Sequence, residues 1–395
     1  MKKTNIDVLL VARPDHSLQI YNELVKSDID FKYLTFKVFP EWLRKFIKNP
    51  KVICISKNVV SSKLMTLYNI LYFKYRWTFL SKISEYAIFE RFFRRTLSKI
   101  EPKIIHYWPK YCYKTINAIK KSNSKIRTIA DIYMPNEQYV IDEMTPILEP
   151  IGLIQNIDYV KKQKEIIEKV LSFENEIIVP SEFVAETYRK FYPDKKYHVI
   201  PYGITVSPSY SRKLILNKKG VFRFVYCGTI SLEKGCDLAC EIISKYPEYE
   251  LHLYGRVMHN ESFLFEKYKN NKNIVFHGTI AKSKIQETVA QYDAGIHLSR
   301  FDAYSLAVGE IIGSGLPIII SNKTGNYIDV KENNLGIVTT LDVENIVNAI
   351  KSISNPEIYN KFIESNHQYV MSEKLSYSEK IINFYRKVLN EQRIV

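Results

Sequence analysis

The sequence has few cysteines and no long apolar run, and both shortages narrow the class of protein. Its 395 residues include five cysteines at irregular spacing. An odd, irregular set argues against a disulfide framework and indicates a reducing compartment. No apolar stretch is long enough to cross a bilayer. The basic start MKKTNIDVLLVA reaches polar residues too soon for a signal peptide. We therefore expect a cytoplasmic protein without a membrane-spanning helix.

Several ligand-binding motifs are also missing. There is no P-loop and no G-x-G-x-x-G fingerprint. Cys236 and Cys240 have C-x3-C spacing, but no set of His and Cys completes a zinc site. Asp28-Ile29-Asp30 matches a D-x-D metal motif, yet three-residue matches arise by chance and this one falls at an expected helix-to-strand turn. We expect neither a metal nor a cofactor.

Positive charge is concentrated in one part of the chain. The formal net charge is +15, and the stretch from Phe31 to Lys99 alone supplies +12, with fifteen Lys and Arg against three acids. Aromatic residues are interleaved with these cations. Such a pattern suits an anionic membrane surface, and stacking with phosphate contacts would also suit single-stranded nucleic acid. Alternatively, the rings are core and the cations are the solvated face of ordinary helices. We expect membrane contact and no nucleic acid. The expected membrane residues are Trp42, Arg44, Lys45, Lys74, Arg76 and Trp77.

Short apolar runs typical of strands alternate with helical segments twice along the chain. This alternation predicts two α/β halves, each with a parallel sheet. Ligands bind beyond the carboxyl ends of such strands, so the expected site lies in a cleft between the halves. We predict a first domain over residues 1–205, a polar linker over 206–220, a second domain over 221–375 and a final segment over 376–395.

The stretch DAGIHLSRFDAYSLAVGEIIGSGLPIIIS has the layout of a ligand site. Two strand patterns flank a helix whose apolar interior contains a single carboxylate, Glu310, and Asp302 stands just before the helix. A carboxylate in an apolar segment is costly unless something hydrogen-bonds it. That partner is either a ligand or a buried Arg or Lys. The N–H groups near Tyr304, Ser305 and Leu306 are expected to be unpaired donors at the helix start, suited to a phosphate.

The order and spacing of motifs in the second half resemble the donor-binding domain of glycosyltransferase family 4, retaining enzymes with the GT-B fold. The resemblance rests on FVYCGTISLEKGCDL, LHLYGR, NIVFHGTI and the stretch around Asp302 and Glu310. It extends to IIVPSEFVAETYRKFYP, HVIPYGI and YSEKIINFYRKVL, from about residue 177 to 390. Ordered spacing is more specific than any single motif. The resemblance implies two Rossmann-like domains facing across a cleft, with 376–395 a helix returning to the first domain.

The resemblance also implies roles for individual residues. Glu310 would accept two ribose hydroxyls of the nucleotide, and Asp302 would hold hydroxyls of the donor sugar, because carboxylates suit vicinal diols. Lys234 would neutralise the leaving diphosphate in place of a metal. The other positions implied to contact the donor are Gly228, Thr229, Arg256, Ile280, Tyr304, Ser305 and Leu306.

Four features depart from the family's pattern. Gly228 is followed by Thr229, where the family commonly has Arg, and Asp302 is one methylene shorter than the family's Glu. The loop ARPDHS lacks the glycines that often let it approach the donor. Ala130 stands where the family has a histidine in its catalytic region. Three polar candidates remain in the first half: Asp131, His106 and His16.

Together these features predict a retaining glycosyltransferase that moves a hexose-type sugar from a nucleoside-diphosphate sugar to a hydroxyl of a growing surface glycan. The basic aromatic stretch suggests a lipid-linked acceptor, as in O-antigen, lipopolysaccharide or capsule assembly, and an enzyme peripheral on the inner face of the membrane. The expected catalytic residues are Asp302, Lys234, His106 and Asp131. The departures keep open a noncatalytic member of the fold that binds or scaffolds a true transferase, and a nucleic-acid-binding protein would rest on charge alone.

Overall fold

The computed structural model of the chain describes residues 3–12, 14–35, 50–54, 82–122, 124–203, 220–372 and 376–394. All six expected membrane residues, Trp42, Arg44, Lys45, Lys74, Arg76 and Trp77, lie outside these ranges. So do residues 206–219 of the expected linker and the side chain of His16. The predictions that concern these residues stay predictions.

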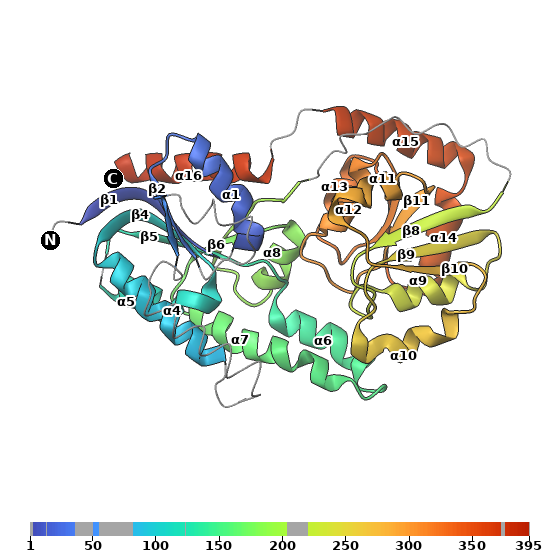
Figure 1. Cartoon of the computed structure of the whole chain (residues 1–395), viewed down its shortest axis with the longest axis horizontal. Coiled ribbons are helices and arrows are strands. Elements are labelled where there is room, and N and C mark those ends of the chain that lie inside the picture. The colour runs from blue at the N-terminus through green and yellow to red at the C-terminus, as the bar shows by residue number, and fades with distance from the viewer. Residues whose placement is uncertain are drawn as a thin grey trace.

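The first half of the chain forms a seven-stranded parallel sheet. Its order is β3-β2-β1-β4-β5-β6-β7, so the winding reverses between β1 and β4 (Figure 1). The VLLV run of β1 is buried, as a central strand covered on both faces requires. The strands are β1 (Thr4–Val11), β2 (Phe31–Thr35), β3 (Val52–Cys54), β4 (Ile100–Tyr107), β5 (Arg127–Asp131), β6 (Glu176–Val179) and β7 (Lys196–Val199).

The second half repeats this plan with six parallel strands. The order is β10-β9-β8-β11-β12-β13, and here the winding reverses between β8 and β11. All four residues of β11 and of β12 are buried, which places these strands in the middle of the domain. The strands are β8 (Phe222–Cys227), β9 (Tyr249–Tyr254), β10 (Ile274–Gly278), β11 (Ala294–His297), β12 (Ile318–Ser321) and β13 (Gly336–Thr339).

Helices cover both sheets, and side-chain caps fix where several of them begin. Asn136 and Asn355 each accept two backbone N–H groups, at the starts of α6 and α15, and Ser181 accepts one at the start of α8. The helices of the first half are α1 (Pro14–Lys26), α4 (Lys82–Leu97), α5 (Pro109–Lys121), α6 (Glu137–Leu148), α7 (Asp158–Leu171) and α8 (Glu182–Arg189). Those of the second half are α9 (Cys236–Ile243), α10 (Ser262–Phe265), α11 (Ile285–Val289), α12 (Leu306–Gly313), α13 (Tyr327–Glu332), α14 (Val343–Ile353) and α15 (Pro356–Met371).

The last helix, α16 (Tyr377–Ile394), belongs to the core of the first domain. It lies beside α1, at the opposite end of the molecule from most of the second domain (Figure 1). Tyr377, Ile381 and Tyr385 are buried in the same apolar cluster as the strands of the first sheet. Arg386 pairs with Asp28 at 2.9 Å. The chain therefore crosses between the domains twice.

The two domains also contact each other directly. Leu232 and Phe301 of the second domain are buried in an apolar cluster whose other fully buried members come from the first domain. Ser181 Oγ donates to the carbonyl oxygen of Ala303 at 2.7 Å. These contacts hold the loops after β8 and β11 against the first domain.

The expected fold class is confirmed, since both halves are α/β with parallel sheets. Helix α1 begins at Pro14, because proline suits the first turn of a helix. The basic stretch also contains strand β2, whose Phe31 and Tyr33 have no exposed surface, so these rings are core. In the described ranges, no helix has the length and apolar character needed to span a membrane.

Candidate functional site

The predicted donor-binding residues gather at the carboxyl edge of the second sheet. The loops that follow β8 and β11 leave the sheet at adjacent strands, where the strand order reverses. Crevices at such points bind ligands in open α/β sheets. The two loops are joined by hydrogen bonds: the N–H of Arg300 and the hydroxyl of Ser299 both donate to the carbonyl oxygen of Glu233, at 2.8 and 3.1 Å.

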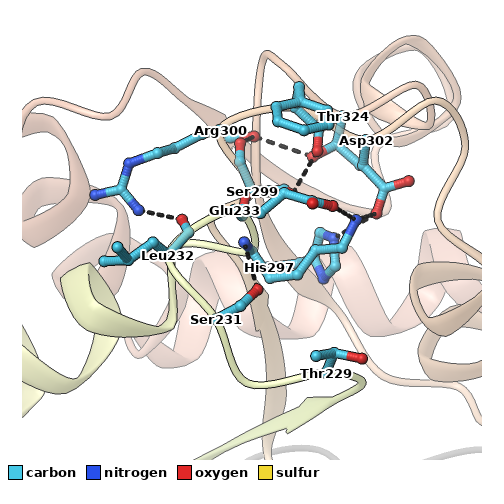
Figure 2. Close-up of polar contacts among 12 residues, drawn as sticks. Thr229, Ser231, Leu232, Glu233, His297, Ser299, Arg300, Asp302 and Thr324 are labelled. Atoms are coloured by element: carbon cyan, nitrogen blue, oxygen red, sulfur yellow. Dashed lines mark hydrogen bonds and ion pairs between the residues drawn. The ribbon is translucent and has the colours of Figure 1, made fainter. Parts of the chain in front are cut away.

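Arg300 fixes the loop that carries Lys234. The buried guanidinium donates to both carboxylate oxygens of Asp237, each at 2.7 Å. It also donates to the carbonyl oxygen of Leu232 (Figure 2). Gly235 makes the turn with a φ of +65°, and a Cβ there would lie 1.8 Å from a carbonyl oxygen of the β11 loop. The EKG sequence therefore needs glycine at this point.

Lys234 and Asp302 form an ion pair at the centre of the site. Lys234 Nζ lies 2.9 Å from Asp302 Oδ2 and 2.9 Å from a carboxylate oxygen of Glu233 (Figure 2). The ring nitrogen Nε2 of the buried His297 lies 3.3 Å from the same oxygen of Asp302. His297 in turn stacks on Tyr226, with an interplanar angle of 11°. The two loops thus bring one cation and two carboxylates together.

This arrangement keeps Asp302 and Lys234 charged at neutral pH. Burial alone would raise the pKa of Asp302, but the Lys234 ammonium and the His297 hydrogen bond hold it well below its usual range. Burial alone would lower the pKa of Lys234, but Asp302 and Glu233 raise it. Because its pKa is lower in the folded state, ionised Asp302 stabilises the folded protein. This contribution to the free energy of unfolding is complete above the unfolded-state pKa, and it is lost as the pH falls through the folded-state pKa.

Helix α12 begins at the edge of the site. Ser305 is its N-cap and accepts from the N–H of Val308 at 3.4 Å. The N–H of Ser305 donates to the buried Asn326 Oδ1 at 2.7 Å, so the expectation that this amide is unpaired is wrong. In the described part of the chain, the N–H groups of Leu306 and Ala307 have no protein partner. Leu306 is also 48% exposed. Two amides and the helix dipole therefore remain open to an anion.

Glu310 lies on α12, one turn beyond these amides, and is half-buried. Its side chain has no hydrogen bond or ion pair to any residue that the structure describes. Burial raises the pKa of Glu310, and the nearby Lys282 only partly offsets this. The alternative that Glu310 is held by a buried Arg or Lys is therefore wrong for the described residues. Its carboxylate is open to a ligand.

The other predicted donor-binding residues lie along the same edge. Gly228 and Thr229 follow β8 and are exposed, as is Arg256 after β9, while Ile280 after β10 is half-buried. Tyr304 is 5% exposed, and its hydroxyl donates to a carboxylate of α13 at 3.0 Å. Tyr304 can therefore present its backbone, and not its hydroxyl, to a ligand.

In the first domain, Asp131 stands at the carboxyl end of β5. Its Oδ2 accepts from the indole N–H of Trp108 at 3.2 Å and lies 3.1 Å from Nε2 of His106. Nδ1 of His106 lies 2.5 Å from the hydroxyl of Tyr385 in α16. A carboxylate needs a donor, so Nε2 carries the proton and Nδ1 accepts from Tyr385. His106 has no exposed surface, and its two ring nitrogens contact Asp131 and Tyr385. Its expected catalytic role stays a prediction, and such a role would have to act through Asp131.

Sequence reasoning missed several residues of these clusters. His297 ends strand β11 on the face opposite Ile296, and a polar residue at the carboxyl end of a parallel strand is a signal that could have found it. Asn326 and Tyr385 had no local signal, because each acts on a residue far away in the chain. In the described ranges, no three His, Cys, Asp or Glu side chains are grouped as a metal site.

Comparison with known proteins identifies the second domain. Residues 210–369 match the family model described as Glycosyl transferases group 1. No curated protein matches the sequence. The chain thus carries a group 1 glycosyltransferase domain in its second half.

Solved structures resemble the whole chain in fold. Sucrose-phosphate synthase from Thermosynechococcus elongatus has a TM-score of 0.67 at 15% identity, covering 99% of this chain and 100% of that one. The lipopolysaccharide outer core galactosyltransferase WaaB, in its apo form, has a TM-score of 0.64 at 14% identity, covering 96% and 98%. HepE from Anabaena, in complex with UDP and glucose, has a TM-score of 0.58 at 14% identity, covering 99% and 100%. The chain has the GT-B fold of these glycosyltransferases.

Proposed function

We propose that this chain is a family 4-like retaining glycosyltransferase. It transfers a hexose-type sugar from a nucleoside-diphosphate sugar to a hydroxyl of a glycan acceptor. The observation that carries the proposal is the alignment of three groups on one edge of the second sheet: the Lys234–Asp302 ion pair, the open amides of α12 and the unpartnered carboxylate of Glu310. The ion pair suits a sugar with its leaving phosphate, and the amides suit a diphosphate. The carboxylate of Glu310 suits a ribose diol.

The chemistry divides among these groups as follows. Glu310 accepts the ribose hydroxyls, and the amides of Leu306 and Ala307 bond the diphosphate at the positive end of the helix. Asp302 holds hydroxyls of the donor sugar. As the bond between the anomeric carbon and the diphosphate oxygen breaks, Lys234 faces the charge that grows on the diphosphate. The acceptor oxygen bonds the same face of the anomeric carbon, and its proton passes to the departing diphosphate.

A thermal-shift experiment tests the donor site. We expect sugars of one nucleoside diphosphate, among UDP-, GDP-, dTDP- and ADP-sugars, to raise the melting temperature in the presence of EDTA. A ligand that binds only the native state stabilises it, by about 2.7 kcal/mol at a hundred times its dissociation constant. Fixed cations and a helix terminus replace a metal in this site, so chelation should not abolish the shift. If every sugar fails, or a shift requires added Mg²⁺ or Mn²⁺, the proposed site is wrong.

A noncatalytic GT-B scaffold is the second candidate. Thr229 is exposed at a position where the resembled family commonly supplies a cation. One cation that would stabilise the leaving group is therefore missing. Slow release of free sugar from the bound donor, without any acceptor, separates the two candidates. Hydrolysis that Lys234→Ala lowers supports the enzyme, whereas tight nucleotide binding with no hydrolysis and no transfer supports the scaffold.

We further propose that the acceptor is lipid-linked and that the enzyme works at an anionic membrane surface in surface polysaccharide synthesis. The concentration of charge between Phe31 and Lys99 supports this, as does the fold shared with a lipopolysaccharide galactosyltransferase. On α4, the described end of this stretch, Arg91, Arg94 and Arg95 are exposed while the rings of Phe89 and Phe93 are buried. These three cations can meet lipid headgroups, and the rings of Phe89 and Phe93 cannot.

Liposome sedimentation tests the membrane proposal. We expect the protein to sediment with phosphatidylglycerol vesicles at low salt, to be released by salt and to bind phosphatidylcholine poorly, since each cation near such a surface contributes about 1 kcal/mol. Reversing Arg44, Lys45, Lys74 and Arg76 to Glu should abolish sedimentation and leave the nucleotide thermal shift intact.

The matched control reverses four exposed lysines elsewhere to Glu: Lys161, Lys162, Lys269 and Lys272. It changes net charge by the same amount, so it should reduce sedimentation far less. Equal loss in both variants would reduce the effect to total charge, and wild-type protein that stays in the supernatant would contradict membrane docking.

A further inference from the structure

Leu232 begins the turn that presents Lys234. The N–H of Gly235 donates to the carbonyl oxygen of Leu232 at 3.0 Å, so residues 232–235 form one tight turn with Lys234 inside it. The same carbonyl oxygen accepts from Arg300. Because the turn is closed by this bond, the placement of the Leu232 backbone determines where the chain at Lys234 lies.

Glu261 holds the other polar backbone group of Leu232. It ends η4 (His259–Glu261), a short 3₁₀-helix in the loop after β9, and it is buried. Its Oε2 accepts from the N–H of Leu232 at 2.7 Å. Burial raises the pKa of Glu261, and this N–H partly offsets the effect. A buried carboxylate is costly unless it is hydrogen-bonded, so the bond fixes Glu261 and Leu232 against each other.

A residue of the first domain reaches the same carboxylate. Asn156 lies in η3 (Ile154–Ile157), within the turn between α6 and α7, and this turn meets the segment before α10 (Figure 1). Asn156 Nδ2 donates to Glu261 Oε1 at 3.4 Å, and Asn156 Oδ1 accepts from Asn260 Nδ2 at 2.6 Å. One carboxylate therefore bonds the first domain through Oε1 and the Lys234 turn through Oε2.

Apolar packing joins the same three segments. The side chain of Leu232 is buried in the first-domain cluster described above, and the α6–α7 turn contributes Leu153 and Ile157 to that cluster. Leu264 of α10 packs against it as well. The α6–α7 turn thus contacts the beginning of the Lys234 turn through both polar and apolar groups.

The geometry points to Glu261 as a positioning residue for Lys234, and to Asn156 as the residue through which the first domain acts on it. Asn156 orients the Glu261 carboxylate, Glu261 holds the Leu232 N–H, and the turn then places the Lys234 ammonium against the leaving diphosphate. Both residues act through Leu232 and contact no substrate. The inference rests on the proposed function for what Lys234 faces, whereas the link from Asn156 to the turn does not depend on that function.

Hydrogen exchange tests the link without any activity. It is followed by mass spectrometry on the full chain, in peptides that cover residues 230–236. We expect Glu261→Ala to raise the exchange rate about tenfold or more, because a buried hydrogen bond to a charged group is lost. Asn156→Ala should raise it less. Glu261→Gln keeps an acceptor oxygen for the Leu232 N–H and should restore most of the protection.

Steady-state kinetics with the donor found by thermal shift test the consequence for Lys234. We expect Glu261→Ala and Asn156→Ala to lower kcat more than they raise the KM for the donor, as removal of the ammonium does, with Glu261→Gln recovering most of the turnover. Binding of the free nucleoside diphosphate should be nearly unchanged, because Glu310 and the α12 amides lie on another segment. A merely structural role would lower nucleotide binding and melting temperature together.

The matched control is Glu143→Gln. Glu143 of α6 pairs with Lys323 of the second domain, and among the described residues neither side chain has a hydrogen bond to the 232–235 turn. This variant breaks another contact between the domains and should leave both exchange and kcat as in wild type. An equal change in the control would reduce the effect to weaker contact between the domains and overturn the inference.

The remaining outcomes separate the inference from the proposed function. Exchange and turnover that stay at the wild-type level in both Glu261→Ala and Asn156→Ala overturn the inference and leave the proposed function standing. An effect of Glu261→Ala alone would remove the first domain from the positioning of Lys234. Exchange that rises as expected in a protein that neither binds nor hydrolyses any nucleotide sugar would keep the link and overturn the proposed function.

Discussion

Replacing Lys234 by alanine is expected to lower the turnover number by about 10²- to 10³-fold, the loss typical of removing one fixed group that faces charge developing in a transition state. The Michaelis constant for the donor should change much less. The ammonium meets a diphosphate whose negative charge increases as the anomeric bond breaks, so its interaction is stronger in the transition state than in the bound substrate. Steady-state kinetics with varied donor measure both constants.

Removing Lys234 also breaks its ion pair with Asp302, so the effect on stability must be separated from the effect on turnover. Lys234→Ala leaves the Asp302 carboxylate without its ammonium in a site where both side chains are largely buried, so the melting temperature should fall. Lys234→Ala/Asp302→Asn also neutralises the largely buried carboxylate and leaves only the more exposed Glu233 without its ammonium. Part of the stability should therefore return while turnover stays low. Lys245→Ala removes an exposed lysine paired with Glu241 and serves as the matched control. Turnover that recovers together with stability would assign Lys234 a structural role only.

The fold could be predicted from the sequence because its strands are short apolar runs between helical segments. Runs such as VLLV in β1 and IIIS in β12 are buried on both faces, and that burial is what makes parallel strands readable. Strand β2 is harder to predict, because its apolar residues lie within the most basic part of the chain. The net charge of that stretch gives no indication that Phe31 and Tyr33 are buried in the core.

Residues of the candidate site could be predicted where they lie close together in the sequence. Contacts between residues far apart in the sequence could not be predicted. Asp302, Ser305 and Glu310 fall within one strand–helix stretch, so their spacing carries information. The bond from the Ser305 amide to Asn326 depends on how the loop after β12 returns to α12, and no local pattern encodes it. The link from Tyr385 to His106 joins residues 279 apart in the chain. It exists only because α16 packs on the first domain.

Replacing Glu310 by glutamine is expected to weaken binding of the free nucleotide by about 10- to 150-fold, since a hydrogen bond to a charged group contributes about 1.5 to 3 kcal/mol. The loss should be the same whichever sugar the donor carries, because the ribose and not the sugar is the partner. Glutamine keeps the shape of the side chain, so the helix should be undisturbed. Calorimetry with the nucleoside diphosphate measures the effect, and wild-type affinity in the variant would remove Glu310 from the ribose site.

The pH dependence of the same variant gives an independent check. Burial raises the pKa of Glu310 above the usual glutamate range, only partly offset by Lys282. Nucleotide affinity should therefore fall on acidification while Asp302, with its depressed pKa, is still ionised.

A raised folded-state pKa also means that ionised Glu310 destabilises the unliganded protein at neutral pH, because the unfolded chain gives up this proton more easily. Glu310→Gln should therefore raise the melting temperature of the unliganded protein at neutral pH and not in acid, while its nucleotide affinity becomes insensitive to pH. A stability gain coupled to a binding loss is the signature of a carboxylate kept partly buried for a ligand, and a variant that loses both would indicate a packing role instead.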